Sequence, residues 1–325
     1  STGTSLQPQL LIMVDFNSTS FHPATFQLTG FPGQEADHHW ISIPFCVVYI
    51  TAIVGNCTVL CIIWAERRLH QPMYLFLCML SVNDLGMSLS TLPTVLGIFC
   101  FDVTDVAFDA CLAQMFFIHS FSNMGSGILL AMSFDRFVAI CDPLRYAAIL
   151  TNPRIVRIGL AVVIRSFSVV LPLPILIKRL PFCRNVLSHA YCLHPDMMRL
   201  ACADTIINNI YGLFAILVTY GLDSVFIILS YVKILRSVFN IASYEQRLTA
   251  LNTCVSHICA VLLFYVPIIA VSIMHRFGGN APRLVHILLS YAYLFVPPVL
   301  NPIVYSVKTK EIRKGISRIF SRDLL

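Results

Sequence analysis

MSFDRFVAICDPLRY (residues 132–146) closes a long apolar run with an acid and a base side by side, Asp135 and Arg136. Charged side chains are costly inside a lipid bilayer, and those found there usually serve a function. A charged pair at the end of an apolar run therefore indicates a membrane boundary with a working element. The residues alone allow two interpretations: the pair only holds the helix end, or it is a switch that opens when the protein changes state.

The composition is that of a membrane protein. Of the 325 residues, 57% are hydrophobic and 12% are charged, and the mean hydropathy is +0.79. A soluble globular protein carries about 25% charged residues. This deficit, with repeated apolar stretches of roughly 20 residues, predicts a chain that crosses the membrane several times. It leaves no room for a soluble catalytic domain, and no nucleic-acid partner is expected.

Seven apolar runs predict an all-α membrane protein, a seven-helix bundle, because backbone groups in lipid must be hydrogen-bonded within their own segment. The expected spans are 41–65, 71–101, 108–140, 154–177, 206–238, 246–275 and 283–306. Residues 1–40 precede the bundle (1–12 as a candidate extension before Met13), 41–306 form it, and 307–325 form a tail. The segment at about 309–320 is predicted to form an amphipathic helix that lies on the anionic inner leaflet. The alternative is a solvated basic tail.

The basic residues divide unequally between the two sides of the predicted bundle. Fifteen lie on the side of the tail and six on the other, with Arg165 inside the fourth span. Lys and Arg are enriched in cytoplasmic loops, so the tail is expected to be cytoplasmic and the N-terminus extracellular at the plasma membrane. Asn17 begins a glycosylation sequon on that outer segment. Residues 1–40 hold no Lys or Arg, so the first span is expected to act as the insertion signal.

Four of the twelve cysteines and two intramembrane acids need partners. The four cysteines lie on the oxidising outer side, where they predict disulfides; three pairings are open, and no metal site is expected among them.

Asp84 lies within the second span and needs a partner or a neutral state, with Asn56 and Asn301 as candidate hydrogen-bond donors. Asp223 in the fifth span is either a satisfied polar residue or part of an activation core. The four outer cysteines named above are Cys111, Cys183, Cys192 and Cys202.

The opening stretch resembles MAYDRYVAICxPLxY, the signature at the inner end of the third helix in olfactory receptors, a branch of the rhodopsin-like G-protein-coupled receptors. Phe134 and Phe137 stand where Tyr is usual. The resemblance covers nearly the whole chain from about residue 26. It includes Gly55-Asn56, PMYLFLCMLSVNDL (72–85), SY (230–231), LTALNTCVSH (248–257, with Leu248 in place of Lys) and NPIVYS (301–306). LIKRLPFC (176–183), the long second outer loop and HRFG (275–278) are similar to the class I, fish-like branch close to family 51.

The resemblance implies a non-enzymatic odorant receptor that activates a stimulatory G protein and raises cyclic AMP. It favours the switch interpretation of Arg136 with Asp135, in which Tyr231 and Tyr305 take part in the rearrangement. It implies the pairs Cys111–Cys192 and Cys183–Cys202. It also implies an allosteric sodium ion at Asp84. Many olfactory receptors add a Glu in the third span where Gly125 stands here, so the sodium site stays open; no other cofactor is expected.

The resemblance places the ligand pocket among the outer halves of the third, fifth and sixth spans, under the second outer loop. Arg276 ends the sixth span; alone it is either a side chain reaching water or a bidentate anchor for a carboxylate. Many class I receptors respond to short carboxylic acids, which favours the anchor. Ser272, four residues earlier, shares its helix face. The other expected pocket residues are His119, His194 on the loop, Gly212 and, two turns below Ser272, Tyr265.

Three other functions would each require features of their own. A transporter needs an internal repeat with broken helices in both halves, and the sequence shows none. A membrane enzyme needs a nucleophile with its base, or a metal cluster, and neither HExxH nor GxSxG occurs. The same receptor acting outside the nose as a sensor of short-chain acid metabolites stays open.

Overall fold

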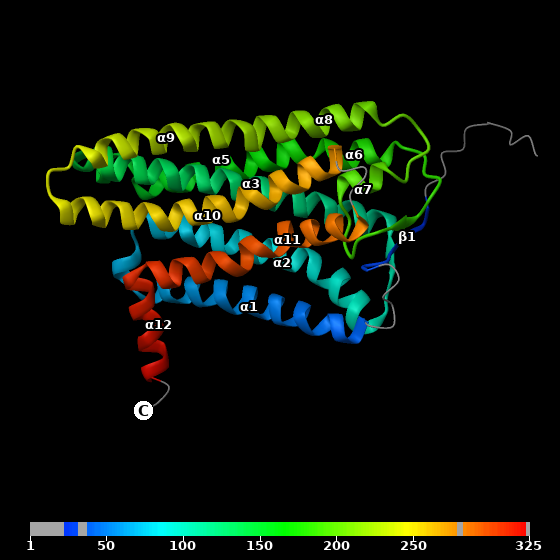
Figure 1. Cartoon of the computed structure of the whole chain (residues 1–325), viewed down its shortest axis with the longest axis horizontal. Coiled ribbons are helices and arrows are strands. Elements are labelled where there is room, and N and C mark those ends of the chain that lie inside the picture. Colours follow the sequence, from blue (N-terminus) through cyan, green and yellow to red (C-terminus); the bar gives the residue numbers. More distant parts are fainter. Residues whose placement is uncertain (1–22, 32–37, 278–281, 323–325) are drawn as a thin grey trace, which may run out of the picture.

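Seven helices in the described part of the chain are long and apolar enough to cross a membrane, and they run side by side as a bundle (Figure 1). The computed structural model describes residues 23–31, 38–277 and 282–322, except the side chains at 277, 283 and 319–322. The bundle consists of α1 (His38–Ala65), α2 (Pro72–Phe101), α3 (Phe108–Cys141), α5 (Asn152–Val170) with α6 (Pro172–Lys178), α8 (Ile206–Ile216) joined by a π-helical turn (Leu217–Gly221) to α9 (Leu222–Phe239), α10 (Tyr244–Phe277) and α11 (Arg283–Lys308). The predicted all-α bundle is confirmed, with span ends within a few residues.

Short elements connect and end the long helices. Both ends of the long helix α2 follow local sequence signals: it begins at Pro72, which suits a first helical turn, and it ends where Asp102 takes a left-handed φ of 52° and its N–H donates to the carbonyl of Ile98 at 3.1 Å. The short elements are η2 (Arg67–Leu69), η3 (Pro143–Arg145), α4 (Tyr146–Ile149), α7 (His194–Met198) and α12 (Lys310–Arg322).

A small three-stranded sheet lies at one end of the bundle, and the sequence did not predict it. Its order is β2-β1-β3, with β1 (Thr25–Leu28) antiparallel to β2 (Asp105–Ala107) and parallel to β3 (Val186–Leu187). Phe26 and Leu28 of β1 are fully buried, so this strand packs as part of the core. We call this end, which also holds both disulfides, the disulfide end, and the opposite one the α12 end.

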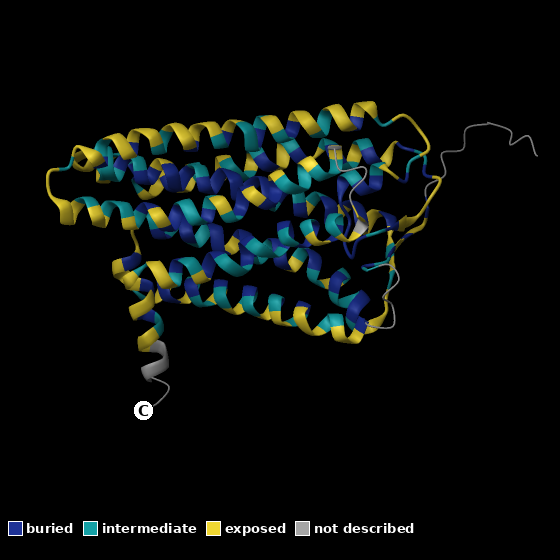
Figure 2. Cartoon of the chain, in the orientation of Figure 1, coloured by how far each residue is buried: buried dark blue, intermediate teal, exposed yellow. Residues whose placement is uncertain are grey.

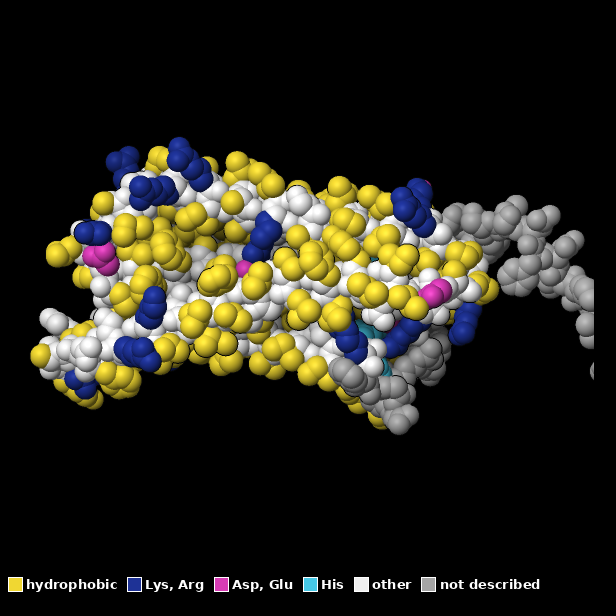
Figure 3. Space-filling model, turned by 90° about the horizontal axis from the view of Figure 1, so that it is seen from above, with side chains coloured by type: hydrophobic (Ala, Val, Ile, Leu, Met, Phe, Trp, Pro, Cys, Tyr) yellow, Lys and Arg dark blue, Asp and Glu magenta, His cyan; other side chains and the backbone are white. Residues whose placement is uncertain are grey.

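The surface of the bundle is apolar around its middle. Buried residues fill the space between the helices, and exposed ones face outward (Figure 2). Large hydrophobic side chains such as Val54, Ile164 and Leu288 are exposed on that outer surface. On the face shown in Figure 3, hydrophobic side chains cover the middle, and Lys and Arg lie mainly near the two ends. This arrangement suits a bilayer around the middle of the bundle.

Helix α12 turns away from the bundle after α11 (Figure 1). Ile312 on its inner face is fully buried, and Arg318 pairs with Glu66 just beyond α1. Gly315 lets the helix approach α1 closely, because a Cβ there would meet Ile62 Cγ2 at 2.5 Å. The amphipathic segment predicted at 309–320 is therefore a helix with one buried and one basic face.

Candidate ligand-binding site

A cavity of about 670 Å³ lies at the disulfide end between α3, α8 and α10, under α7. Pockets for drug-sized ligands fall in the range of roughly 300–1,000 Å³. Five of the six residues predicted to bind ligand line it; these are His119, His194, Gly212, Ser272 and Arg276. These five residues come from four separate segments, namely α3, the loop before α8, α8 itself and α10.

The loop between α6 and α8 covers the cavity as a lid, which we define as residues 183–202. The lid is joined to α3 by Cys111–Cys192, and Cys183–Cys202 closes the loop on itself, the two pairs that the resemblance implies. Inside the lid, Leu193 and Met197 are buried. The lid is therefore a packed layer over the cavity and not a loose loop.

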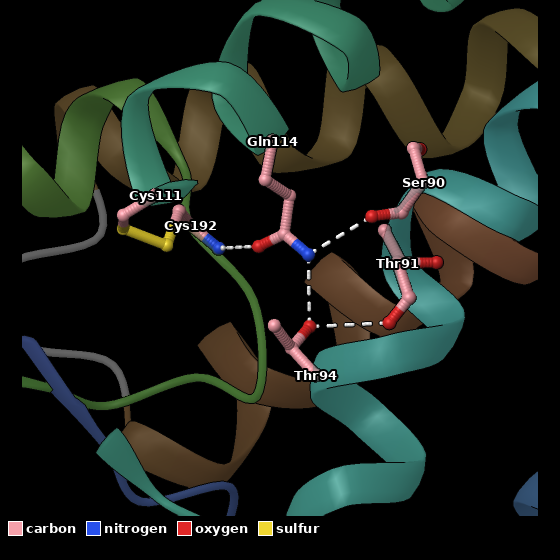
Figure 4. The surroundings of a disulfide bond; sticks show 6 residues. All are labelled: Ser90, Thr91, Thr94, Cys111, Gln114 and Cys192. Atoms are coloured by element: carbon pink, nitrogen blue, oxygen red, sulfur yellow. Dashed lines mark hydrogen bonds between the residues drawn. A yellow bond between two sulfur atoms is a disulfide. The ribbon is translucent and has the colours of Figure 1, made fainter. Parts of the chain in front are cut away.

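Gln114 supports the disulfide from the next helical turn (Figure 4). Its Oε1 accepts from the backbone N–H of Cys192 at 2.9 Å, and its Nε2 donates to the carbonyl of Ser90 at 3.0 Å and to Thr94 Oγ1 at 2.8 Å. One amide thus ties the lid to α3 and α2. The sequence signal for it was a polar residue three positions after Cys111, on the same helix face.

The lid contains a buried acid, Asp196, and two buried histidines, His189 and His194. His189 Nδ1 lies 2.9 Å from Asp196 Oδ2. Burial raises the pKa of Asp196, but the nearby His189 and other basic groups outweigh it and hold that pKa below its usual value. Burial, reinforced by His119, lowers the pKa of His194 to about 3, so its ring faces the cavity uncharged at neutral pH.

Several buried polar atoms on the cavity wall have no hydrogen-bond partner within the described residues. Buried polar groups in native proteins nearly always have such a partner, so the wall offers both donors and acceptors to a polar ligand. The atoms are His119 Nε2, Asn123 Oδ1, His194 Nε2, Asn208 Nδ2 and His275 Nδ1.

Arg276 lies at the rim of this cavity. Its Nη1 is 3.4 Å from the carbonyl of Ser272, one turn earlier on α10. The ion pairs found among residues 23–31, 38–277 and 282–322 do not include it. Its guanidinium therefore keeps most of its capacity to bind an anion.

Tyr265 is the predicted pocket residue that does not line the cavity. Its hydroxyl lies 2.8 Å from Ser126 Oγ, which in turn donates to Asp223 Oδ2 at 2.7 Å. Arg165 donates two hydrogen bonds to the same carboxylate, from Nη1 at 2.7 Å and from Nη2 at 2.8 Å. These four residues, which we call the polar core, join α3, α5, α9 and α10. Asp223, whose role the sequence left open, is thus the shared acceptor of a four-helix network.

Tyr220 connects the cavity with this polar core. It lines the cavity, and its hydroxyl donates to Ser122 Oγ at 2.8 Å on α3. Its ring lies 6.3 Å from that of Phe264, which is 5.2 Å from the ring of Tyr265. The packed rings of Tyr220, Phe264 and Tyr265 therefore form a continuous contact from the cavity wall to the polar core.

At the α12 end the Asp135–Arg136 pair is closed. Arg136 Nε donates to Asp135 Oδ2 at 2.9 Å, and the hydroxyl of Tyr146 donates to Asp135 Oδ1 at 2.7 Å. Asp135 is fully buried. Tyr146 ends the stretch that opened the sequence analysis, but its role as a partner of Asp135 was not foreseen.

Tyr231 and Tyr305 have other partners than Arg136. His257 Nε2 lies 3.0 Å from the carbonyl of Leu129, so this nitrogen donates and Nδ1 accepts from the Tyr231 hydroxyl at 2.6 Å. The Tyr305 hydroxyl lies 4.0 Å from Met132 Sδ. Among the described residues, neither tyrosine hydroxyl is thus hydrogen-bonded to Asp135 or Arg136.

The surroundings of Asp84 do not favour a sodium site. Asn301 Nδ2 donates to its carboxylate at 2.9 Å, as expected, but Asn56 donates instead to the carbonyls of Ala52 and Pro298, which corrects the second expected contact. A Cβ at Gly125 would meet Phe264 Cε2 at 2.8 Å, so an aromatic ring fills the place of a second acid. The Asn17 sequon lies outside the described residues.

Comparison with known proteins agrees with this geometry. Residues 45–323 match the family described as olfactory receptor. Olfactory receptor 51I1 of Homo sapiens is 61% identical over 96% of this chain and 99% of its own length. Olfactory receptor 51G2 of Homo sapiens is 58% identical over 94% and 97%, and olfactory receptor 51E2 of Rattus norvegicus is 52% identical over 94% and 95%. The chain therefore belongs to family 51 of the olfactory receptors, which are seven-span G-protein-coupled receptors and not enzymes.

Proposed function

We propose that this receptor binds a carboxylic acid in the cavity under the lid and then activates a stimulatory G protein, raising cyclic AMP. One observation carries the proposal: Arg276 stands at the rim without an ion pair among the described residues, above a wall of unpartnered buried polar atoms. A guanidinium binds a carboxylate through two parallel hydrogen bonds, and such charged bonds are about twice as strong as neutral ones. The rings of His119 and His194 then donate or accept at the ligand's polar end.

The orientation that this function needs has the disulfide end outside the cell. The basic residues support it, since fifteen lie toward the α12 end and six toward the disulfide end. Two disulfides also suit the oxidising extracellular side. A ligand would then reach the cavity from outside, and the Asp135–Arg136 pair would face the G protein.

Activation requires that the ligand bind the active state better than the resting one. In the closed arrangement, Ser272 and Arg276 belong to α10, and Tyr265 on the same helix holds the polar core through Ser126. A ligand that draws the outer part of α10 toward α3 would strain this contact. We infer that release of the Tyr265–Ser126 bond is the step that lets the α12 end of α10 move.

The test is cyclic AMP in cells that express the chain, exposed to a panel of carboxylic acids and neutral odorants. Arg276→Ala is expected to lose the acid response, and Arg276→Lys to recover part of it, because lysine keeps the charge without the two-pronged geometry. Arg184→Ala is the matched control, since Arg184 is an exposed arginine of the lid that does not line the cavity. Responses to neutral odorants alone, at equal surface level, would remove the acid proposal.

A further inference from the structure

We propose that the cavity opens sideways between α8 and α10 into the outer leaflet, and that the receptor takes aliphatic acids whose chain runs out through this opening. The inference rests on the proposed function, because it needs the disulfide end outside and Arg276 as the carboxylate anchor. It extends that function from short volatile acids to membrane-dissolved fatty acids.

The opening is marked by residues that line the cavity and face outward at once. Ile206, Ile210 and Leu213 are on the cavity wall, yet they are 59%, 63% and 42% exposed. They follow one another down the first turns of α8, over about 10 Å at 1.5 Å per residue. A wall whose side chains are this exposed is open to its surroundings along that length.

The centre of the lid is closed in the same structure. Leu193 and His194, which form the cavity roof, are only 2% and 4% exposed. The Cys111–Cys192 disulfide and the Gln114 amide hold this roof on α3, and the hydroxyl of Tyr191 donates to the carbonyl of Ser290 on α11 at 2.6 Å. A ligand leaving the cavity therefore meets less protein at α8 than through the middle of the roof.

The surroundings of the opening are apolar. Ile207 and Phe214 on α8, and Ile269 and Ile273 on α10, are all exposed on the outer surface of the two helices and do not line the cavity. Exposed isoleucine and phenylalanine on spanning helices face lipid tails. The medium beyond the opening is hydrocarbon, which accepts an alkyl chain and not a second charged group.

Asn123 and Asn208 also line the cavity, but the lining along the opening is graded in the direction that an amphiphile needs. Arg199, Thr205 and Arg276 lie at the upper edge, level with the start of α8, and Ile210, Leu213 and Ile216 continue below. A carboxylate at the upper edge would leave its chain against the isoleucines and the leucine. A cavity of about 670 Å³ also exceeds what an acid of a few atoms fills.

The test is a chain-length series from acetic to hexadecanoic acid, read as the concentration for half-maximal cyclic AMP. In wild type, potency should rise about fourfold per added methylene for the shorter acids and persist in the longest, since each buried methylene strengthens binding by that factor. Ile210→Trp narrows the opening, so it should weaken long acids at least tenfold more than short ones. Ile207→Trp is the control on the same helix, exposed but not lining the cavity.

Three outcomes would overturn the inference. One is a wild-type response that is lost beyond medium chain length although short acids act, which leaves the proposed function standing. Another is Ile210→Trp behaving like Ile207→Trp for every acid; Ile206→Trp replaces it if Ile210→Trp fails to reach the surface. The third is a surface-expressed wild type that responds to no acid, which removes the proposed function as well.

Discussion

Asp223 owes its role to its neighbours at the scale of single residues. It is almost fully buried in the apolar middle of the bundle, where an unpaired carboxylate would be expensive. Two bonds from Arg165 and one from Ser126 compensate this cost. Breaking such a pair costs more than replacing both members with apolar residues, because the remaining charge stays buried alone.

Arg165→Met is therefore expected to destabilise the receptor by about 3–5 kcal/mol, the range for a buried pair that loses one partner. The double variant Arg165→Met with Asp223→Leu should regain much of that loss. Arg157→Met, an exposed arginine on the same helix, should change stability by less than about 0.5 kcal/mol. Thermal unfolding of the purified receptors measures all three. A double variant that loses as much stability as Arg165→Met alone, or more, would contradict the argument.

His194 makes the lid sensitive to acid. Its pKa is lowered from 6.5 to about 3 by burial and by His119, whose ring lies 6.5 Å away. An opened lid therefore binds more protons than the closed one between these two values. The contribution of neutral His194 to the stability of the closed lid is complete above about pH 6.5. It decreases as the pH falls toward 3, by up to about 1.4 kcal/mol per pH unit.

Ligand potency is thus expected to fall when the external pH is lowered from about 7.5 to about 5.5. His194→Gln should flatten that dependence, since the amide does not titrate. His39→Gln, an exposed histidine on α1, is the control and should behave like wild type. Dose–response curves at both pH values decide the matter. Equal slopes in wild type and His194→Gln would assign the effect to another group.

At the scale of elements, the lid depends on a few fixed points. Gln114 satisfies the N–H of Cys192 and, through its own amide group, two oxygens of α2. Its removal would leave the disulfide intact but a buried N–H unpaired, which costs about 1–3 kcal/mol. The covalent bond alone limits how far the lid can move, but not its angle to α3.

Gln114→Leu is expected to lower the melting temperature and to speed ligand release, because the lid then tilts about its disulfide. Gln114→Glu is the matched variant, because its carboxylate still accepts from the N–H of Cys192 but no longer donates to Ser90 and Thr94. Its loss of stability should therefore come from the contacts with α2 alone and differ in size from the loss in Gln114→Leu. Washout kinetics of the cyclic AMP signal report ligand release. Unchanged washout in Gln114→Leu would show that the disulfide suffices.

The long helices were predictable and the short strands were not. A span is recognised from about twenty residues whose hydropathies add, so errors at single positions cancel and the ends of α2 and α3 fell within a residue of expectation. Strand β1 has four residues, and its partners lie far along the chain. The folded bundle brings these distant strands together, so their pairing leaves no pattern in the local sequence.

The cavity was predicted in part for a similar reason. Helical spacing gives the face that a residue shares, so Ser272 and Arg276 were placed together correctly. It does not give depth: Tyr265 follows the same spacing but lies in the polar core. Asn123 and Asn208, which carry unpartnered atoms on the wall, gave no signal beyond being polar in an apolar run.

At the scale of the whole molecule, the ligand and the G protein must communicate across the bundle. His119 and Arg136 are on one helix, α3, and their separation along it is about 26 Å at 1.5 Å per residue. Between them, Ser126 holds α10 through Tyr265, and Leu129 holds it through His257. The resting arrangement is thus secured at several levels of one helix, and the Asp135–Arg136 pair is the level nearest the α12 end.

Asp135→Asn is expected to raise cyclic AMP without ligand, because Arg136 loses its charged partner and the open state gains population. A loss of about 1.4 kcal/mol from the closed state changes the ratio of the two states tenfold. Tyr146→Phe removes one hydrogen bond from Asp135 and keeps the ion pair, so it should raise the basal signal less. Both variants must be compared with wild type at equal surface level. A silent Asp135→Asn that still responds to ligand would mean that the bonds of Ser126 and Leu129 to α10, and not the charged pair, hold the receptor closed.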